Sequence, residues 1–101
     1  MKVQNMTSNS TGRAIPNQFI ITEYGRGALG NFLKRETFQS YDSTIAIVTT
    51  WPCEEKVELD ANSWNYSVTT GRYRNQFLGE TKKETEKKIK SGEYKLVNLN
   101  G

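Results

Sequence analysis

Residues 67–99, SVTTGRYRNQFLGETKKETEKKIKSGEYKLVNL, are predicted to form two helices followed by a strand. Ser67 or Thr69 can cap a first helix, because both side chains can accept hydrogen bonds from free backbone N–H groups. That helix is predicted to run to about Leu78. Gly79 follows where helices commonly end in a left-handed residue.

The first helix has an inner and an outer face. Thr70, Tyr73 and Phe77 recur at the spacing of one helical face, so we expect them to point into the core. The polar residues lie on the flanks and the outside; they are Arg72, Asn75 and Gln76.

A second helix is predicted over residues 82–91. Thr81 followed three residues later by Glu84 is the pattern of a capping box, and Gly92 marks the end. Ile89 is its one clearly apolar residue, so the helix is expected on the surface with a single anchor. Two i, i+4 ion pairs are expected along it, Glu84–Lys88 and Glu86–Lys90.

Strands are predicted on either side of the helices. β-Branched and aromatic residues favour strands at 17–23, 37–50, 56–60 and 94–99, with a break near 41–43. The resulting order is β-β-β-α-α-β. The expected fold is α+β, a small antiparallel sheet of about four strands with two helices in the C-terminal half.

Two segments fall outside these elements. Residues 1–12 are small and polar and are expected to be flexible. Residues 24–36, YGRGALGNFLKRE, are expected to form a long hairpin loop whose apolar tip holds Leu29, Phe32 and Leu33. This tip either contacts a partner or folds back and caps the core.

Length and residue usage exclude several classes of enzyme. The 101 residues suit one domain spanning 1–101. There is no histidine, so the Ser-His-Asp mechanism is excluded, and the single Cys53 is expected to be a small buried or partly buried residue. We expect no enzymatic activity, no cofactor and no metal site. The nearby carboxylates are expected on a solvated edge; they are Glu54, Glu55, Glu58 and Asp60.

The compartment follows from the same inventory. A lone cysteine suits a reducing compartment, and residues 1–11 have no apolar core of a signal peptide. The longest nearly apolar run, residues 45–48, is too short to cross a bilayer. We therefore expect a cytoplasmic protein without membrane contact.

Charge is unevenly distributed along the chain. The net charge is +3, with a balance of −1 over residues 1–71 and +4 over residues 72–101. The basic C-terminal third is either an anion-binding surface or an ordinary solvated helix, since glutamates are mixed through it. The lysines that would contact nucleic acid are Lys82, Lys83, Lys87 and Lys90.

Residues 64–77, WNYSVTTGRYRNQF, interleave aromatic side chains with arginines and amides. Aromatic and Arg side chains are frequent anchors of protein interfaces. Arg72, Arg74 and Gln76 are the candidate contacts to a protein partner, together with the apolar tip of 24–36. The alternative is that the aromatic residues of this stretch belong to the core.

Three segments resemble one family: NQFIIT at 17–22, FQSYDSTIA at 38–46, and 64–100, which begins WNYSVTTGRYRNQFLG. It is a family of small proteins from tailed phages and prophages of Gram-positive bacteria, and the resemblance covers about three quarters of the chain. Residues 24–36 depart from it, because the family joins the first two strands by a shorter turn.

The resemblance implies a setting. Small accessory phage proteins often disable a host enzyme by occupying its surface, as anti-CRISPR proteins do. We therefore expect an inhibitor, in the cytoplasm of the bacterial host, of a defence or nucleic-acid-processing enzyme such as the CRISPR effector nuclease Cas9. The alternative is a protein that binds nucleic acid directly through its basic C-terminal third.

Overall fold

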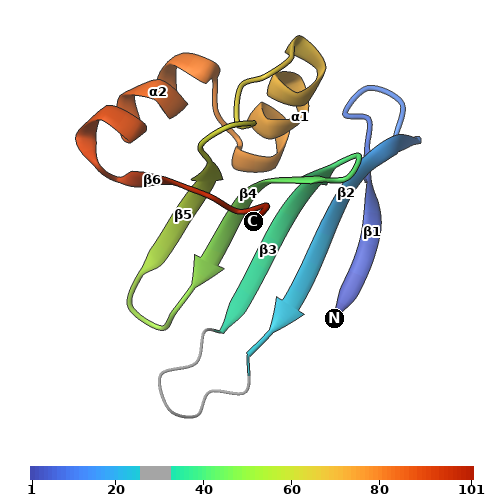
Figure 1. The fold of residues 1–101 in the computed structure, drawn as a ribbon. Coiled ribbons are helices and arrows are strands. Elements are labelled where there is room, and N and C mark those ends of the chain that lie inside the picture. Colours follow the sequence, from blue (N-terminus) through green and yellow to red (C-terminus); the bar gives the residue numbers. More distant parts are fainter. Residues whose placement is uncertain (26–32) are drawn as a thin grey trace.

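The chain forms a single twisted sheet with both helices gathered at one end of it (Figure 1). The computed structural model describes residues 1–25 and 33–101. In chain order the described elements are β1 (Lys2–Thr7), β2 (Ala14–Tyr24), β3 (Lys34–Ser40), β4 (Ser43–Thr50), β5 (Glu55–Asp60), α1 (Val68–Leu78), α2 (Lys82–Ser91) and β6 (Tyr94–Val97).

The sheet follows the order of the sequence, β1-β2-β3-β4-β5-β6. Neighbours from β1 to β5 are antiparallel, whereas β6 runs parallel to β5 because α1 and α2 form the crossover between them. The α+β class is confirmed. The prediction of about four antiparallel strands was wrong: the described sheet has six strands and is mixed.

One missed strand is β1, in the segment predicted to be flexible. Lys2 pairs with Thr22 of β2, and Met6 is only 2% exposed. The Asn5 side chain also donates to the Ile15 carbonyl at 3.0 Å. An edge strand can be polar and still be ordered, because its stability comes from backbone pairing with its neighbour and from one buried side chain.

The second missed strand arises because residues 37–50, predicted as one strand with a break, belong to two separate strands, β3 and β4. The expected break at 41–43 is confirmed, and Tyr41 takes a positive φ of 54° in the turn. The loop predicted over 24–36 is shorter at both ends, because β2 includes Tyr24 and β3 starts at Lys34. Closing this end of the β2–β3 pair, the Gly25 amide donates to the Leu33 carbonyl at 3.1 Å.

The core lies between the sheet and α1. Phe38, Ile45 and Leu59 are fully buried, and Phe77 of α1 places its ring 5.7 Å from that of Phe38. Tyr73 is also packed against the core, so the predicted inner face of α1 is confirmed. Tyr73 and Phe77 are partly buried, and the fully buried residues of that helix are Thr70 and Arg74.

The helix ends follow the sequence closely. Ser67 rather than Thr69 caps α1, accepting from the Thr70 amide at 3.1 Å, and Gly79 is left-handed. Both hydrogen bonds of the predicted capping box of α2, between Thr81 and Glu84, are present.

The predicted ion pairs along α2 were wrong. The Glu84 carboxylate turns back to the capping box, and Glu86 lies 4.0 Å from Lys82. Lys88 bonds instead to Glu80, at 2.7 Å. Thr85 is a second anchor of α2, fully buried and donating to Glu80 at 2.9 Å.

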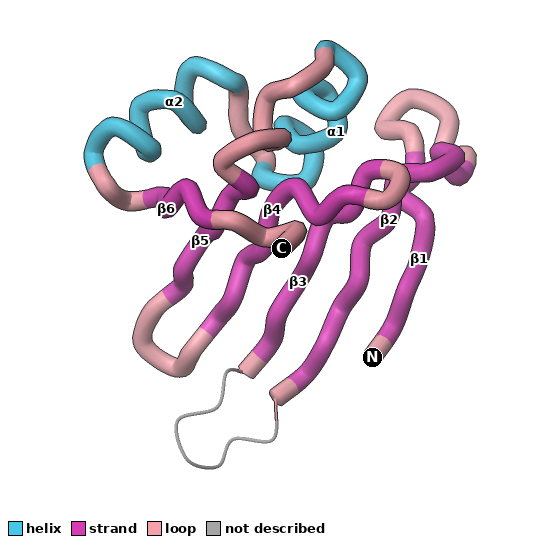
Figure 2. Tube along the Cα trace, viewed as in Figure 1, coloured by secondary structure: helices cyan, strands magenta, loops and turns pink. Residues whose placement is uncertain are grey.

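The last residues lie across the end of β4 (Figure 2), where Asn100 exchanges two side-chain hydrogen bonds with the Thr44 backbone. Asp60 anchors this tail, since its carboxylate accepts from the Leu99 amide at 2.9 Å and from Ser63 at 2.6 Å. Burial acts to raise the pKa of Asp60, but these hydrogen bonds outweigh it and lower the pKa. Asp60 is thus buried, contrary to the expectation of a solvated edge.

Candidate functional site

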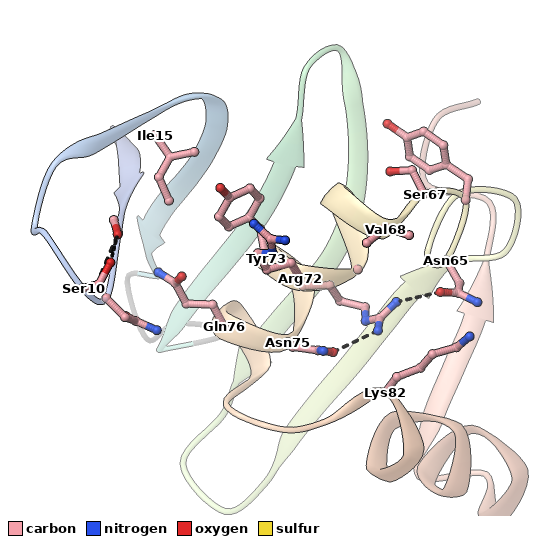
Figure 3. Close-up of a pocket in the computed structure, with 15 residues that line it drawn as sticks. Ser10, Ile15, Asn65, Ser67, Val68, Arg72, Tyr73, Asn75, Gln76 and Lys82 are labelled. Carbon is pink, nitrogen blue, oxygen red and sulfur yellow. Dashed lines mark hydrogen bonds between the residues drawn. The ribbon is translucent and has the colours of Figure 1, made fainter.

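An open cleft of about 1020 Å³ lies around α1. One side is formed by residues 8–10, in the turn between β1 and β2, and by Ile15 near the start of β2. The other side comprises residues 65–68, which lead into α1, and Lys82 at the start of α2. Figure 3 shows the outward side chains of α1 between these two sides. Residues 8–10 and Lys82, which are far apart in the sequence, thus line the same cleft.

The cleft has a positive charge. Its described lining residues include Arg72, Arg74 and Lys82 but no Asp or Glu. The first turn of α1, whose N–H groups give a partial positive charge, likewise holds no acidic residue. The cleft is therefore suited to an anionic group.

Arg74, a predicted contact to a partner, is buried in the free protein. Its side chain is fully buried, with the guanidinium 5.1 Å from the centre of the Trp64 ring. The terminal nitrogens donate to the Trp64 carbonyl at 2.6 Å, to Asn75 Oδ1 at 2.9 Å and to Asn65 Oδ1 at 3.5 Å. Arg74 therefore fixes residues 64–65 against α1, and it is not an exposed anchor.

The charge of Arg74 is incompletely balanced. All its hydrogen bonds within the described chain go to neutral oxygens, and Nε has no partner there. Burial lowers its pKa, and the fields of Glu80 and Glu86 oppose this. Glu80 is already paired with Lys88. The guanidinium nevertheless remains charged, since Arg is protonated in proteins at ordinary pH.

The other predicted contacts on α1 have different roles. Arg72 is exposed on the cleft wall, as the prediction requires. Gln76 is partly buried and donates to the Thr7 carbonyl at 2.7 Å, so it holds the end of β1 against α1.

Two cleft residues were missed at the sequence level. Val68, the first residue of α1, is 83% exposed, and Tyr66 just before it is 53% exposed. Sequence reasoning left Tyr66 among possible core aromatics. An apolar residue at the first position of a capped helix, where its side chain cannot reach the inner face, is the signal that could have identified Val68.

The apolar tip is described only at its edge. Leu33 is 48% exposed, and its amide donates to the Thr50 carbonyl at 2.8 Å. Leu29 and Phe32 lie outside the described residues. Their role as interface or core cap therefore stays a prediction.

The four candidate lysines divide between two surfaces. Lys82 lines the α1 cleft, whereas Lys83, Lys87 and Lys90 lie on the exposed side of α2, around a second hollow. Glu84 and Glu86 also line that hollow and interrupt the positive charge. The fold therefore does not bring these lysines into one patch.

Cys53 is exposed, which corrects the expectation of a buried or partly buried thiol. It lies in the turn between β4 and β5, which the Trp51 amide closes by donating to the Glu54 carbonyl at 2.8 Å, so the core does not reach it. Within residues 1–25 and 33–101, no group of three or more His, Cys, Asp or Glu is arranged to hold a metal ion. No helix in the described part of the chain is long and apolar enough to cross a membrane.

Comparison with known proteins places the chain in a family. Residues 1–93, which include β1 to β5, α1, α2 and the whole cleft, match a family of unknown function, DUF8033. The chain belongs to this family. Searches of curated proteins and of solved structures give no significant match. The DUF8033 match spans the β1–β2 turn and both helices, which are the elements that build the cleft.

Proposed function

We propose that this DUF8033 protein acts by binding another protein through the α1 cleft. The observation that supports this most strongly is the exposure of Tyr66, Val68 and Arg72 around one open cleft. Tyr and Arg are enriched among residues that dominate interface energies, where each truncation costs at least about 2 kcal/mol. Burying an exposed Val side chain contributes about 1.5 kcal/mol or more.

The cleft is also held in place before any partner arrives. Ser67 caps α1, Gln76 fixes the end of β1, and Arg74 fixes residues 64–65. A surface that is already ordered loses less conformational entropy on binding, so more of the contact energy contributes to affinity.

For the target, we propose a host defence or nucleic-acid-processing enzyme, such as the effector nuclease Cas9, inhibited by a phage accessory protein. The support is the resemblance of residues 64–100 to small phage proteins, because this segment includes α1 and most of the cleft. Inhibition by occupying a surface requires anchors and shape, both of which the cleft provides. It requires no catalytic group.

The test is affinity capture from a bacterial host lysate, with and without nuclease, at two salt concentrations. The tagged wild-type protein should retain one protein partner after nuclease treatment and inhibit its activity when both are purified. Arg72→Ala or Tyr66→Ala should weaken capture by at least about 2 kcal/mol, or roughly thirtyfold. The control replaces the exposed lysines of α2 by alanine (Lys83, Lys87 and Lys90) and should capture normally.

Direct nucleic-acid binding is the second candidate. It is favoured by Lys83, Lys87 and Lys90, which are exposed and form no ion pair within the described chain. Binding through phosphates would fall steeply with salt and would depend on these lysines rather than on Arg72. Recovery of nucleic acid alone, with normal capture by Arg72→Ala, would replace the first proposal by this one.

A further inference from the structure

We infer that the α2 side of the cleft, around Gly71, Arg74 and Lys82, binds a carboxylate from an acidic segment of the protein partner. This deepens the proposed function and rests on it in taking the partner to be a protein. Two observations support the inference: a buried cation that has no anionic hydrogen-bond partner among the described residues, and a glycine beside that cation.

The buried cation is the guanidinium of Arg74. Charged groups inside proteins are normally paired, because loss of hydration is costly unless an opposite charge offsets it. Here the acceptors are a carbonyl and two side-chain amides, and Nε is buried without a partner among the described residues. A ligand carboxylate at this end of the cleft would supply the missing opposite charge.

The glycine is Gly71, inside α1. Glycine destabilises a helix interior relative to alanine, so its presence there calls for a structural reason. A Cβ atom on Gly71 would lie 3.7 and 3.8 Å from the two terminal nitrogens of Arg74. Gly71 and Arg74 both line the cleft. The guanidinium is fully covered, so a ligand reaches it only where Asn65 moves aside, and a Cβ on Gly71 would obstruct that approach because it would also lie 3.9 Å from Asn65 Oδ1.

The hydrogen bonds of Arg74 indicate which contact a ligand would replace. Asn65, an exposed residue, accepts from Arg74 at 3.5 Å, the longest of the three guanidinium bonds. An incoming carboxylate would replace this neutral acceptor and form a stronger, charge-assisted bond. Figure 3 shows Asn65, Asn75 and Lys82 at this end of the cleft. Its dashed lines include the hydrogen bonds from the guanidinium to the side-chain oxygens of Asn65 and Asn75.

Lys82 is available for the second carboxylate oxygen. Its nearest acidic partner, Glu86, is 4.0 Å away, and both side chains are about half exposed, so their attraction is weak. Tyr66 and Val68 line the same cleft and are exposed. Apolar residues beside one cationic recess favour an acidic side chain with apolar neighbours over a run of phosphates.

The experiment is a titration followed by ¹⁵N NMR, with an acetylated and amidated Glu-Leu-Glu-Leu peptide as the probe. Saturable shifts should appear in the side-chain amide signals of Asn65 and Asn75. The matched Gln-Leu-Gln-Leu peptide should produce none. Gly71→Ala, which places a Cβ beside the terminal nitrogens of Arg74, and Lys82→Gln should each weaken binding at least about tenfold, since a charge contact is blocked or removed.

Lys83→Gln is the control, because it removes the same charge from the next residue of α2, which lines the other hollow. It should change the affinity by less than about twofold. The inference would be overturned by an absent response, by an equal response to the Gln peptide, or by equal effects of Lys82→Gln and Lys83→Gln. A thymidine oligonucleotide that shifts Asn65 and Asn75 more strongly than the peptide would overturn it in favour of phosphate.

Failure of this inference is distinguishable from failure of the proposed function. If the peptide gives no response while capture of the protein partner still depends on Arg72, only the carboxylate site is wrong. If the peptide binds as expected but the lysate yields nucleic acid alone, the protein-partner proposal is wrong and an acidic ligand of another origin occupies the cleft.

Discussion

Replacing Gly71 by alanine should make the protein more stable, although this residue borders the cleft. Gly71 is absent from the residues with positive φ, so its helical backbone suits alanine. The new Cβ would meet Arg74 at 3.7 and 3.8 Å and Asn65 at 3.9 Å, which are ordinary contact distances. Alanine in a helix interior is favoured over glycine by about 0.5–1 kcal/mol.

For a domain of 101 residues, 1 kcal/mol corresponds to roughly 4–8 °C in the melting temperature. Gly71→Ala should therefore raise the midpoint by about 2–8 °C, measured by circular dichroism and checked by urea unfolding. Thr69→Ala is the control: it also improves helix propensity, at an exposed residue of α1 outside the cleft lining. A lower midpoint for Gly71→Ala alone would show that the guanidinium leaves no room for a Cβ and would refute the reasoning.

Three further predictions concern the core, the thiol and the alkaline limit of stability. Phe77→Ala should cost about 3 kcal/mol in urea unfolding, the low end for a Phe truncation, because the ring packs on Phe38 but is only partly buried; an unchanged unfolding midpoint would contradict this. Cys53→Ser should keep both the midpoint and partner capture, since the thiol is exposed in a turn; loss of capture in a folded variant would give the thiol a role. Burial, and then the hydrogen bond with Glu80, raise the pKa of Tyr94 to about 12. The folded state therefore holds this proton more tightly than the unfolded state, and about 1–2 kcal/mol of stability present below pH 10 should be lost as the pH rises to 12. Urea unfolding across this range should show a smaller loss for Tyr94→Phe, and identical losses would contradict the assignment.

Local signals were sufficient for the helical third of the chain. Caps depend on residues three or four positions apart, so Ser67, Thr81 and the two glycines after the helices could be read without tertiary information. The ion pairs of α2 could not be predicted in this way, because Glu80 lies outside the helix and competes for Lys88 through a contact that depends on the fold.

The sheet was harder to predict because its edges depend on partners distant in sequence. β1 has a polar sequence, and its order comes from pairing with β2 rather than from its own residues. The direction of β6 depends on the crossover that precedes it.

The cleft was predicted in part. The sequence identified the segment that contains it, and Arg72 is exposed there as expected. Burial of Arg74 was not foreseeable, since it requires Trp64, Asn65 and Asn75 to supply a ring and oxygens from one small region. The contribution of residues 8–10 to the cleft wall could not be predicted either, because it depends on the pairing of β1 with β2.

The most direct test of the α1 cleft as the binding surface is hydrogen exchange of the protein alone and with its captured partner. Binding through the cleft predicts slower exchange at the backbone amides of residues 65–72 and of the β1–β2 turn, with the exposed side of α2 around Lys87 unchanged. Protection confined to α2, with exchange at residues 65–72 unaltered, would contradict it.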